Sequence, residues 1–121
     1  MSPKPFLVIA GLSGALAVTA GAFAAHGLEP MRGARAASLW QTASQYQLIH
    51  AVALLWIARL EPGRLALVGG GLFTLGTLLF CGALYGLGWW GPSALGVIAP
   101  IGGLSFTLGW ATLAALGLQR R

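Results

Sequence analysis

The sequence predicts an all-α membrane protein, a bundle of four transmembrane helices with both termini in the cytoplasm. Seven Lys or Arg and two Asp or Glu are the only charged side chains among 121 residues, a fraction of 7%, whereas an average soluble domain has about 25%. Hydrophobic residues make up 57% of the chain. A soluble fold with so few charges would expose large apolar patches to water. The lipid bilayer is therefore the expected environment and partner.

The same composition excludes other classes of protein. A disordered chain needs low hydrophobicity, and this chain is mostly hydrophobic. The 19 glycines show no three-residue period, which a collagen triple helix requires. The basic residues stand at the ends of the predicted spans and form no cluster that follows phosphates. No nucleic-acid partner is therefore expected.

The first two charge-free segments each hold one helix. Residues 5–28 and 36–58 contain 24 and 23 residues, and one helix needs about 20 apolar residues to cross a hydrocarbon core of about 30 Å. We place these helices at about 6–25 and 38–60. The first half of the second helix is polar, with Ser38, Gln41, Thr42, Ser44, Gln45, Gln47 and His50. Neighbouring helices must shelter that half from lipid.

The N-terminal segment also resembles a secretory signal peptide. Lys4 precedes an apolar stretch that ends near the small residues of the Ala-Phe-Ala triplet 22–24, as at a signal cleavage site. The apolar stretch is long for a signal peptide, so we expect a retained first helix.

The third charge-free segment, residues 65–119, is 55 residues long and holds two helices. Residues 88–93 read Gly-Trp-Trp-Gly-Pro-Ser. Gly and Pro mark a turn, and a Trp pair suits a membrane–water interface. We place the two helices at about 65–87 and 93–118. Spanning β-strands are excluded, because they need strict alternation over about 10 residues and residues 72–80 are apolar almost throughout.

The loop between the first two spans can form a short interfacial helix over residues 30–37. Pro30 suits the first position of such a helix. Arg32 and Arg35 are expected to contact anionic lipid headgroups, although both side chains can equally be solvated.

Orientation follows from the positive charges in short loops, which favour the cytoplasmic side. With four spans, five basic side chains share one side with the N-terminal amine, and two lie on the other side. The five are Lys4, Arg59, Arg64, Arg120 and Arg121, and the two are Arg32 and Arg35. Both termini are therefore predicted to be cytoplasmic.

Small residues predict where the helices pack, because helices in lipid associate through close contact of small side chains. Residues spaced four apart share one helix face. Such rows are Ser13, Ala17, Gly21 and Ala25; Gly82 and Gly86; and Ala99, Gly103, Thr107, Ala111 and Ala115. The glycine pair can also serve a homo-oligomer. Pro100 leaves the carbonyl of Gly96 without its helical donor and is expected to kink the fourth helix.

Polar residues gather in the predicted outer half of the bundle. The predicted cluster comprises His26, Gln41, Thr42, Gln45, Tyr46, Gln47, His50 and Tyr85. At about 1.5 Å per residue from an interfacial Trp40, His50 lies about 15 Å deep. Polar groups at that depth are costly and normally face the interior of a bundle. The helices are therefore expected to enclose a small pocket there.

Four interpretations of this cluster stay open. The polar side chains can simply bond neighbouring helices and fix their packing. His26 and His50 can supply two axial ligands to a haem, but their predicted depths differ and no Cys or carboxylate joins them. A proton or ion path would lack any Asp or Glu inside a span. Quinone or lipid binding is the fourth interpretation.

No catalytic residue, metal site or cofactor is predicted. Glu29 and Glu61 are the only carboxylates and are expected on opposite sides of the membrane, so a paired-carboxylate mechanism has no basis. The sequence has no nucleophile elbow and no phosphate-binding glycine loop. The single cysteine, Cys81, is expected to be a small packing residue.

Several blocks of the sequence resemble one known family. The blocks are residues 21–28 (GAFAAHGL); Trp40-Gln41-Thr42 with Tyr46, Gln47 and His50; residues 80–85 (FCGALY); and residues 100–103 (PIGG) with Gly109-Trp110. In this order they are similar to the YgdD/YwdK family of small integral membrane proteins. Departures from the family pattern fall at Ala24, Cys81 and Ala99, where Gly, Ser and Thr are usual. The resemblance implies a four-span protein of the bacterial cytoplasmic (inner) membrane and leaves its activity open.

The sequence therefore favours a non-enzymatic membrane protein whose polar cluster organises the bundle and holds a small ligand or a partner helix. A small oligomeric channel or transporter is the second interpretation. A haem- or quinone-binding subunit of a larger membrane complex is the third.

A reporter protein fused after Arg121 tests the predicted orientation. Because the basic residues are concentrated on the side of the termini, we expect the reporter to be active only in the cytoplasm of intact cells. Activity on the outer side alone would show that the span count or the orientation is wrong.

Overall fold

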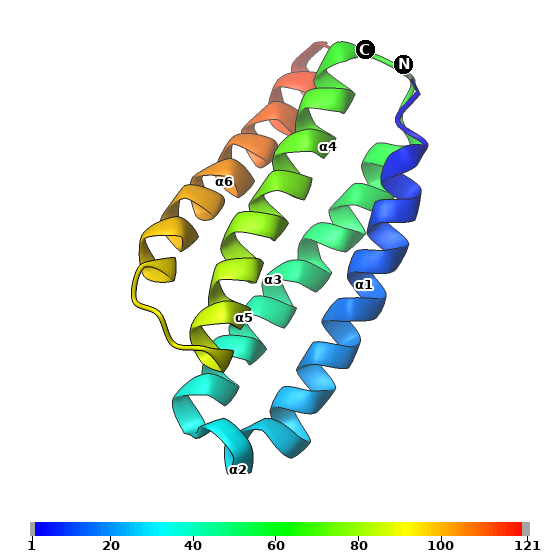
Figure 1. The fold of residues 1–121 in the computed structure, drawn as a ribbon. Helices are drawn as coiled ribbons and strands as arrows, with labels where there is room; N and C mark the ends of the chain where they lie inside the picture. Colours follow the sequence, from blue (N-terminus) through cyan, green and yellow to red (C-terminus); the bar gives the residue numbers. More distant parts are fainter. Residues whose placement is uncertain (1, 120–121) are drawn as a thin grey trace.

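The computed structural model describes residues 2–119 as four long helical rods that run side by side (Figure 1). The first and third rods each contain a short π-helical segment, a feature that is rare and often found at functional sites. In chain order the elements are α1 (Pro5–Phe23), η1 (Ala24–Leu28), α2 (Glu29–Arg32), α3 (Ala34–Arg59), α4 (Arg64–Gly76), η2 (Thr77–Cys81), α5 (Gly82–Trp89) and α6 (Leu95–Gln119). The all-α fold class is confirmed for this part of the chain.

The loop predicted as a short helix over residues 30–37 is divided by Gly33 in the structure. Gly33 has a φ of 94°, a left-handed conformation that glycine adopts without a steric penalty. Its N–H donates to the carbonyl of Glu29 at 2.7 Å. The residues before Gly33 therefore extend the first rod to Arg32, and those after it begin α3.

Among residues 2–119, three helices are long and apolar enough to cross a membrane. They are Pro5–Arg32, Arg64–Trp89 and Leu95–Gln119. The remaining rod, α3, is the second along the chain and has 26 residues, a similar length. It carries the polar side chains that the sequence places in the first half of the second helix, and these make it less apolar than the others.

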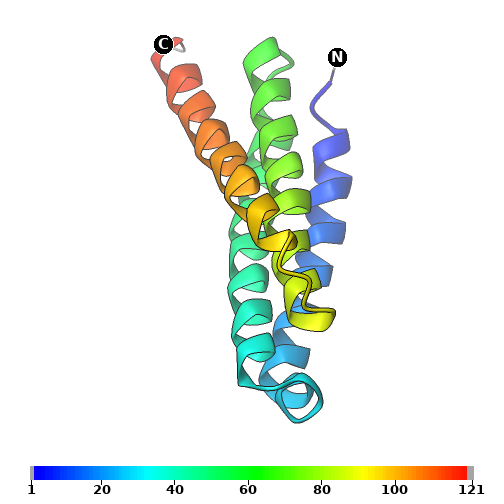
Figure 2. The same cartoon turned by 60° about the vertical axis from the view of Figure 1, so that its left-hand side comes forward.

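Helix α3 contacts most of the other elements. α1 packs along α3, α4 packs along α6, and α3 also contacts η1, α2, α4, η2 and α5. Figure 2 shows that α6 crosses the bundle obliquely, so that its orange C-terminal part lies on the side opposite α1. Both ends of the chain lie at the same end of the bundle (Figure 1). The rods therefore alternate in direction along the chain.

Glycines let α4 and α6 approach each other closely. Phe106 of α6 packs on Gly76, where an added Cβ would lie 2.5 Å from the ring. Phe73 of α4 packs in the same way on Gly109, with an added Cβ 2.6 Å from its ring. Both phenylalanines are buried. Each helix thus supplies one ring and one glycine to the other.

In the packing row predicted for the first rod, Ser13 and Ala17 are buried. Gly21 lies opposite Ser44 of α3, and a Cβ added at Gly21 would lie 2.9 Å from the Ser44 hydroxyl oxygen. Ala25, the last member of the row, is exposed, because it lies in the π-helical segment where the four-residue spacing no longer keeps one face.

The packing row predicted for the fourth helix is displaced around the helix axis. Gly103 is half-buried, Thr107 is exposed, and the Thr107 hydroxyl donates to the Gly103 carbonyl at 3.0 Å. The buried face is formed by Ala99, Gly102, Ser105, Phe106, Gly109 and Leu116. Pro100 lies within α6 with its ring exposed. The packing of Phe73 and Phe106 against glycines of the facing helix favours this rotation. Rows of small residues in the sequence do not indicate it.

The two glycines of the predicted GxxxG pair differ. Gly86 is buried, and a Cβ added there would lie 2.7 Å from a methyl group of Leu95. Gly82 is exposed, and an added Cβ would meet open space. Within the described residues the pair therefore does not form one helix contact.

The closest approach of two helices predicts a sensitive position at Gly102. A Cβ added there would clash with the backbone of Phe80 in η2, and a backbone cannot rotate away as a side chain does. We expect Gly102→Ala to lower the free energy of unfolding by about 1–3 kcal/mol, measured as a lower thermal midpoint in detergent. Gly96→Ala in the same helix is the matched control, because its added Cβ meets open space. Equal midpoints for the two variants would contradict the close approach.

Candidate functional site

His50 occupies a buried aromatic site between α3, α4 and α6. Its side chain is 4% exposed. The Phe106 ring stacks on the imidazole with centroids 3.6 Å apart, and the Phe73 ring meets it edge-on at 5.3 Å. Trp110 completes the site with a ring centroid 5.7 Å away.

Both ring nitrogens of His50 have hydrogen-bond partners. Nδ1 lies 2.6 Å from the backbone carbonyl of Tyr46, and Trp110 Nε1 lies 3.0 Å from Nε2. A carbonyl only accepts and an indole N–H only donates. The pair of bonds therefore requires a neutral imidazole that carries its proton on Nδ1 and accepts at Nε2. In this arrangement neither nitrogen is open to a metal ion.

The second polar cluster ties three rods together through Gln47. Its amide Nε2 donates to the Ser13 hydroxyl of α1 at 3.2 Å. Its Oε1 accepts from the Tyr85 hydroxyl of α5 at 2.7 Å. Gln47 is buried, where an unbonded amide would be unfavourable. Both the nitrogen and the oxygen of its amide have hydrogen-bond partners on neighbouring helices.

Aromatic side chains gather between α1, α3 and α5 at the end of the bundle that contains Gly33, which we call the loop end. Trp40 Nε1 donates to the backbone carbonyl of Tyr85 at 3.0 Å. The Trp40 ring packs edge-on against Tyr85 at 4.9 Å and against Phe23 at 5.6 Å, and lies 6.0 Å from Trp89. The group is drawn from α1, α3 and α5. Trp and Tyr are typical of the membrane–water interface.

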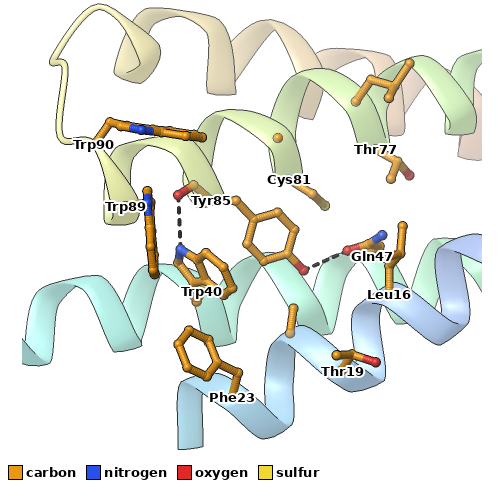
Figure 3. A pocket seen from close by; sticks show the side chains of 13 residues that line it. Leu16, Thr19, Phe23, Trp40, Gln47, Thr77, Cys81, Tyr85, Trp89 and Trp90 are labelled. Carbon is orange, nitrogen blue, oxygen red and sulfur yellow. Dashed lines mark hydrogen bonds between the residues drawn. The ribbon is translucent and has the colours of Figure 1, made fainter. Parts of the chain in front are cut away.

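A groove opens between α1 and the third rod, with α3 as its floor (Figure 3). Its volume is about 660 Å³, within the range of about 300–1,000 Å³ that is usual for ligand sites. The lining residues are Leu16, Thr19, Ala20, Phe23, Trp40, Gln47, Thr77, Leu78, Cys81, Gly82, Tyr85, Trp89 and Trp90. From Thr77 to Trp89 the wall is about 18 Å long, at about 1.5 Å per residue.

The wall of the groove is apolar even where its residues are polar. The Thr19 and Thr77 hydroxyls donate to the carbonyls of Ala15 and Phe73 in their own helices, at 2.8 and 2.9 Å. Gln47 and Tyr85 bond to each other, as Figure 3 shows. These polar groups are therefore turned away or satisfied, and the groove presents hydrocarbon and aromatic surface.

The structure divides the predicted polar cluster. Gln47, His50 and Tyr85 lie inside the bundle, but in two separate hydrogen-bonded groups. Thr42 is half-buried, and Tyr46 is 43% exposed with its ring 4.8 Å from that of Phe80. The remaining three, His26, Gln41 and Gln45, are exposed.

Sequence reasoning missed the aromatic partners of His50 and Trp40. Trp110, Phe106 and Trp89 belong to the sites but carry no polar signal in an apolar helix. Only the four-residue spacing of Phe106 and Trp110 places both on one face, and the pattern does not say which face is buried.

Arg32 and Arg35 line a smaller pocket of about 290 Å³ at the loop end of the bundle. The Arg32 guanidinium carbon lies 4.4 Å from the centroid of the Trp89 ring, a cation–π contact. The sequence predicts lipid headgroup contacts for both arginines, and that role stays a prediction.

A family model described as "Protein of unknown function (DUF423)" matches residues 20–103. The chain belongs to this family. Among relatives of the DUF423 chain, a UPF0382 membrane protein of Haemophilus influenzae is 39% identical over 111 residues, which cover 90% of each chain. The UPF0382 membrane protein YwdK of Bacillus subtilis is 38% identical, over 88% of this chain and 90% of the relative. The UPF0382 inner membrane protein YgdD of Escherichia coli is 34% identical, over 100% of this chain and 96% of the relative.

The resemblance to the YgdD/YwdK family is thereby confirmed. The DUF423 chain is a membrane protein, and its predicted location in a bacterial inner membrane is confirmed by these relatives and by its apolar helices. No solved structure matches it.

The hydrogen bond between Trp110 and His50 predicts a stability difference between two tryptophans. Trp110→Phe keeps an aromatic ring but leaves the buried Nε2 of His50 without its donor, which costs about 1–3 kcal/mol. We expect a lower midpoint of thermal unfolding in detergent, measured by circular dichroism. Trp56→Phe is the matched control, because Trp56 is 63% exposed. A drop of equal size in both variants would argue against the bond.

Proposed function

We propose that the DUF423 chain is a single membrane domain, residues 1–121, that crosses the bilayer four times and has both termini in the cytoplasm. The three apolar rods support three spans. α3 connects Gly33 at one end of the bundle with Leu60 at the other, so it must cross as well if its neighbours do. Its 26 residues extend about 39 Å. The five-to-two distribution of basic residues favours cytoplasmic termini.

Within this architecture the proposed function is to bind the apolar tail of a membrane lipid in the groove between α1 and α5. The single observation that carries the proposal is the apolar wall of a groove of about 660 Å³. A hydrocarbon core of about 30 Å has two leaflets, so one acyl chain extends about 15 Å. The groove, about 18 Å long at 1.5 Å per residue, suits one such chain.

The polar clusters serve this function by holding the walls apart at a fixed distance. α1 touches the rest of the bundle mainly along α3, and the Ser13–Gln47–Tyr85 chain links α1 through α3 to α5. Trp40 adds a second link between α3 and α5. A rigid frame lowers the entropic penalty of binding a ligand.

The rival functions find less support. A pore lined by Thr42, Tyr46 and His50 would need an open His50, whose ring is buried and bonded at both nitrogens. The same bonds leave no nitrogen of His50 for a haem iron. A quinone headgroup needs hydrogen-bond partners in the groove. The Tyr85 hydroxyl and the Gln47 amide oxygen, which lie there, already bond to each other.

An enzymatic role also finds less support, because the described residues show no group of catalytic or metal-binding side chains that lie together. Glu29 lies on α2 and Glu61 follows α3 at the opposite end of the bundle. Within residues 2–119 no three His, Cys, Asp or Glu side chains lie together in a way that would hold a metal ion.

Gly82→Leu tests the proposal by filling the groove. Gly82 lines the groove, and a Cβ added there meets open space. We therefore expect the variant to fold, as checked by circular dichroism. We expect several-fold fewer phospholipids bound per protein after incubation with a bacterial phospholipid extract, counted by native mass spectrometry.

Gly71→Leu is the matched control, because Gly71 is also an exposed helix glycine with open space beside it and lies outside the groove. Unchanged lipid binding in Gly82→Leu would overturn the proposal. Loss of a dimer in Gly82→Leu alone would assign the face to a second copy of the chain instead.

A further inference from the structure

We infer that the lipid held by the groove is anionic and that Arg32 and Arg35 bind its phosphate in the pocket at the loop end of the bundle. This inference rests on the proposed function, since it assigns the headgroup of the same ligand. It goes beyond that function by naming the chemical class of the lipid and the residues that select it.

The pocket lies where three elements meet. Arg32 is the last residue of α2, Arg35 is in the first turn of α3, and Trp89 and Trp90 stand at the end of α5. Its volume is about 290 Å³, so it holds a group the size of a phosphate together with water.

The pocket continues the groove. Trp89 and Trp90 line both spaces, and Figure 3 shows them at the end of the groove away from Thr77 and Leu16. A molecule whose tail lies in the groove therefore reaches the two arginines past these indole rings. An amphiphile with an apolar tail and a charged head matches this sequence of surfaces.

The cation–π contact orients Arg32 in this pocket. Its guanidinium lies 4.4 Å above the Trp89 ring, which occupies one face of the group. The N–H donors point outward in the plane of the guanidinium and remain able to bind phosphate oxygens, commonly in pairs. Trp89 thus lines the groove that holds the acyl tail and, through the cation–π contact, orients the Arg32 side chain that binds the headgroup.

The local charge favours an anion. The chain has only two carboxylates, Glu29 and Glu61, and neither lines the pocket. Glu29, one turn before Arg32 on α2, is exposed and offsets part of the positive charge. α3 has no side-chain N-cap, so the positive end of its dipole adds to the field of the arginines.

The position in the bilayer favours a lipid phosphate over a free anion. A Trp pair marks the interface where headgroups lie, and basic residues at this depth attract anionic lipids. A free phosphate would use the pocket and leave the adjoining groove without a role. The proposal therefore commits to a phospholipid with a net negative headgroup.

The test compares two lipids with identical acyl chains, phosphatidylglycerol and phosphatidylcholine, on the full-length protein in detergent by native mass spectrometry. We expect the wild type to retain phosphatidylglycerol more strongly by about fivefold for each arginine. The Arg32→Gln/Arg35→Gln double variant is expected to lose this preference and still retain phosphatidylcholine. Arg35→Gln alone leaves the Arg32–Trp89 contact intact and is expected to lose part of the preference.

The double variant Arg59→Gln/Arg64→Gln is the charge-matched control, because both residues lie at the opposite end of the bundle; it should keep the preference. Equal retention of the two lipids by the wild type would overturn the inference and leave the proposed function standing. Retention of neither lipid would overturn both. A preference that survives in Arg32→Gln/Arg35→Gln, or that inorganic phosphate abolishes, would also overturn the inference, the latter by assigning the pocket to a free anion.

Discussion

A polar side chain inside an apolar helix bundle needs a hydrogen-bond partner from its own protein, and the rest of this structure depends on how α3 meets that requirement. Its imidazole, amide and indole all bond to neighbouring helices: His50 to Trp110 of α6, Gln47 to Ser13 of α1 and to Tyr85 of α5, and Trp40 to the backbone of Tyr85. In an apolar interior such bonds have few competitors. The least apolar helix is thus the one that holds the others in place.

Helices α4 and α6 are held together mainly by side-chain packing, with one hydrogen bond from the Ser105 hydroxyl to a backbone carbonyl of α4 at 2.7 Å. Phe73 and Phe106 each fill the space beside a glycine of the facing helix, and both also contact His50. α1 makes one such contact with the third rod, near its own N-terminal end, where Phe6 packs on a glycine of α4. Toward the loop end of the bundle the polar links of α3 hold α1 at a distance, and a groove remains. The satisfied hydroxyls and amides make that groove apolar, which is why a lipid tail suits it better than a polar ligand.

The number and approximate positions of the helices are readable from the sequence, because the charged residues and the Gly-Pro turn separate the apolar segments. The limits are less exact, since the first rod runs on to Arg32 and α3 begins at Ala34. The predicted helices at 6–25, 38–60, 65–87 and 93–118 each have a counterpart in the structure. The rows of small residues were a weaker guide: Ser13 and Ala17 are buried, but Thr107 and Gly82 face outward. In an apolar helix every face looks alike to a periodicity argument, so the rotation of α6 was not predictable. The break at Gly33 was likewise hidden, since a φ of 94° is one of several conformations open to glycine.

The sequence by itself determined that this is a helical membrane protein with four long helices, and that His50, Gln47 and Tyr85 need partners. Composition and charge spacing suffice for this, because they act through local and additive transfer free energies. Only the tertiary structure decided which partners they have, that His26 lies apart from His50's site, and that an apolar groove adjoins two arginines. Those facts depend on how far each helix is rotated and where α1 fails to meet α5, which are properties of side chains distant in the sequence.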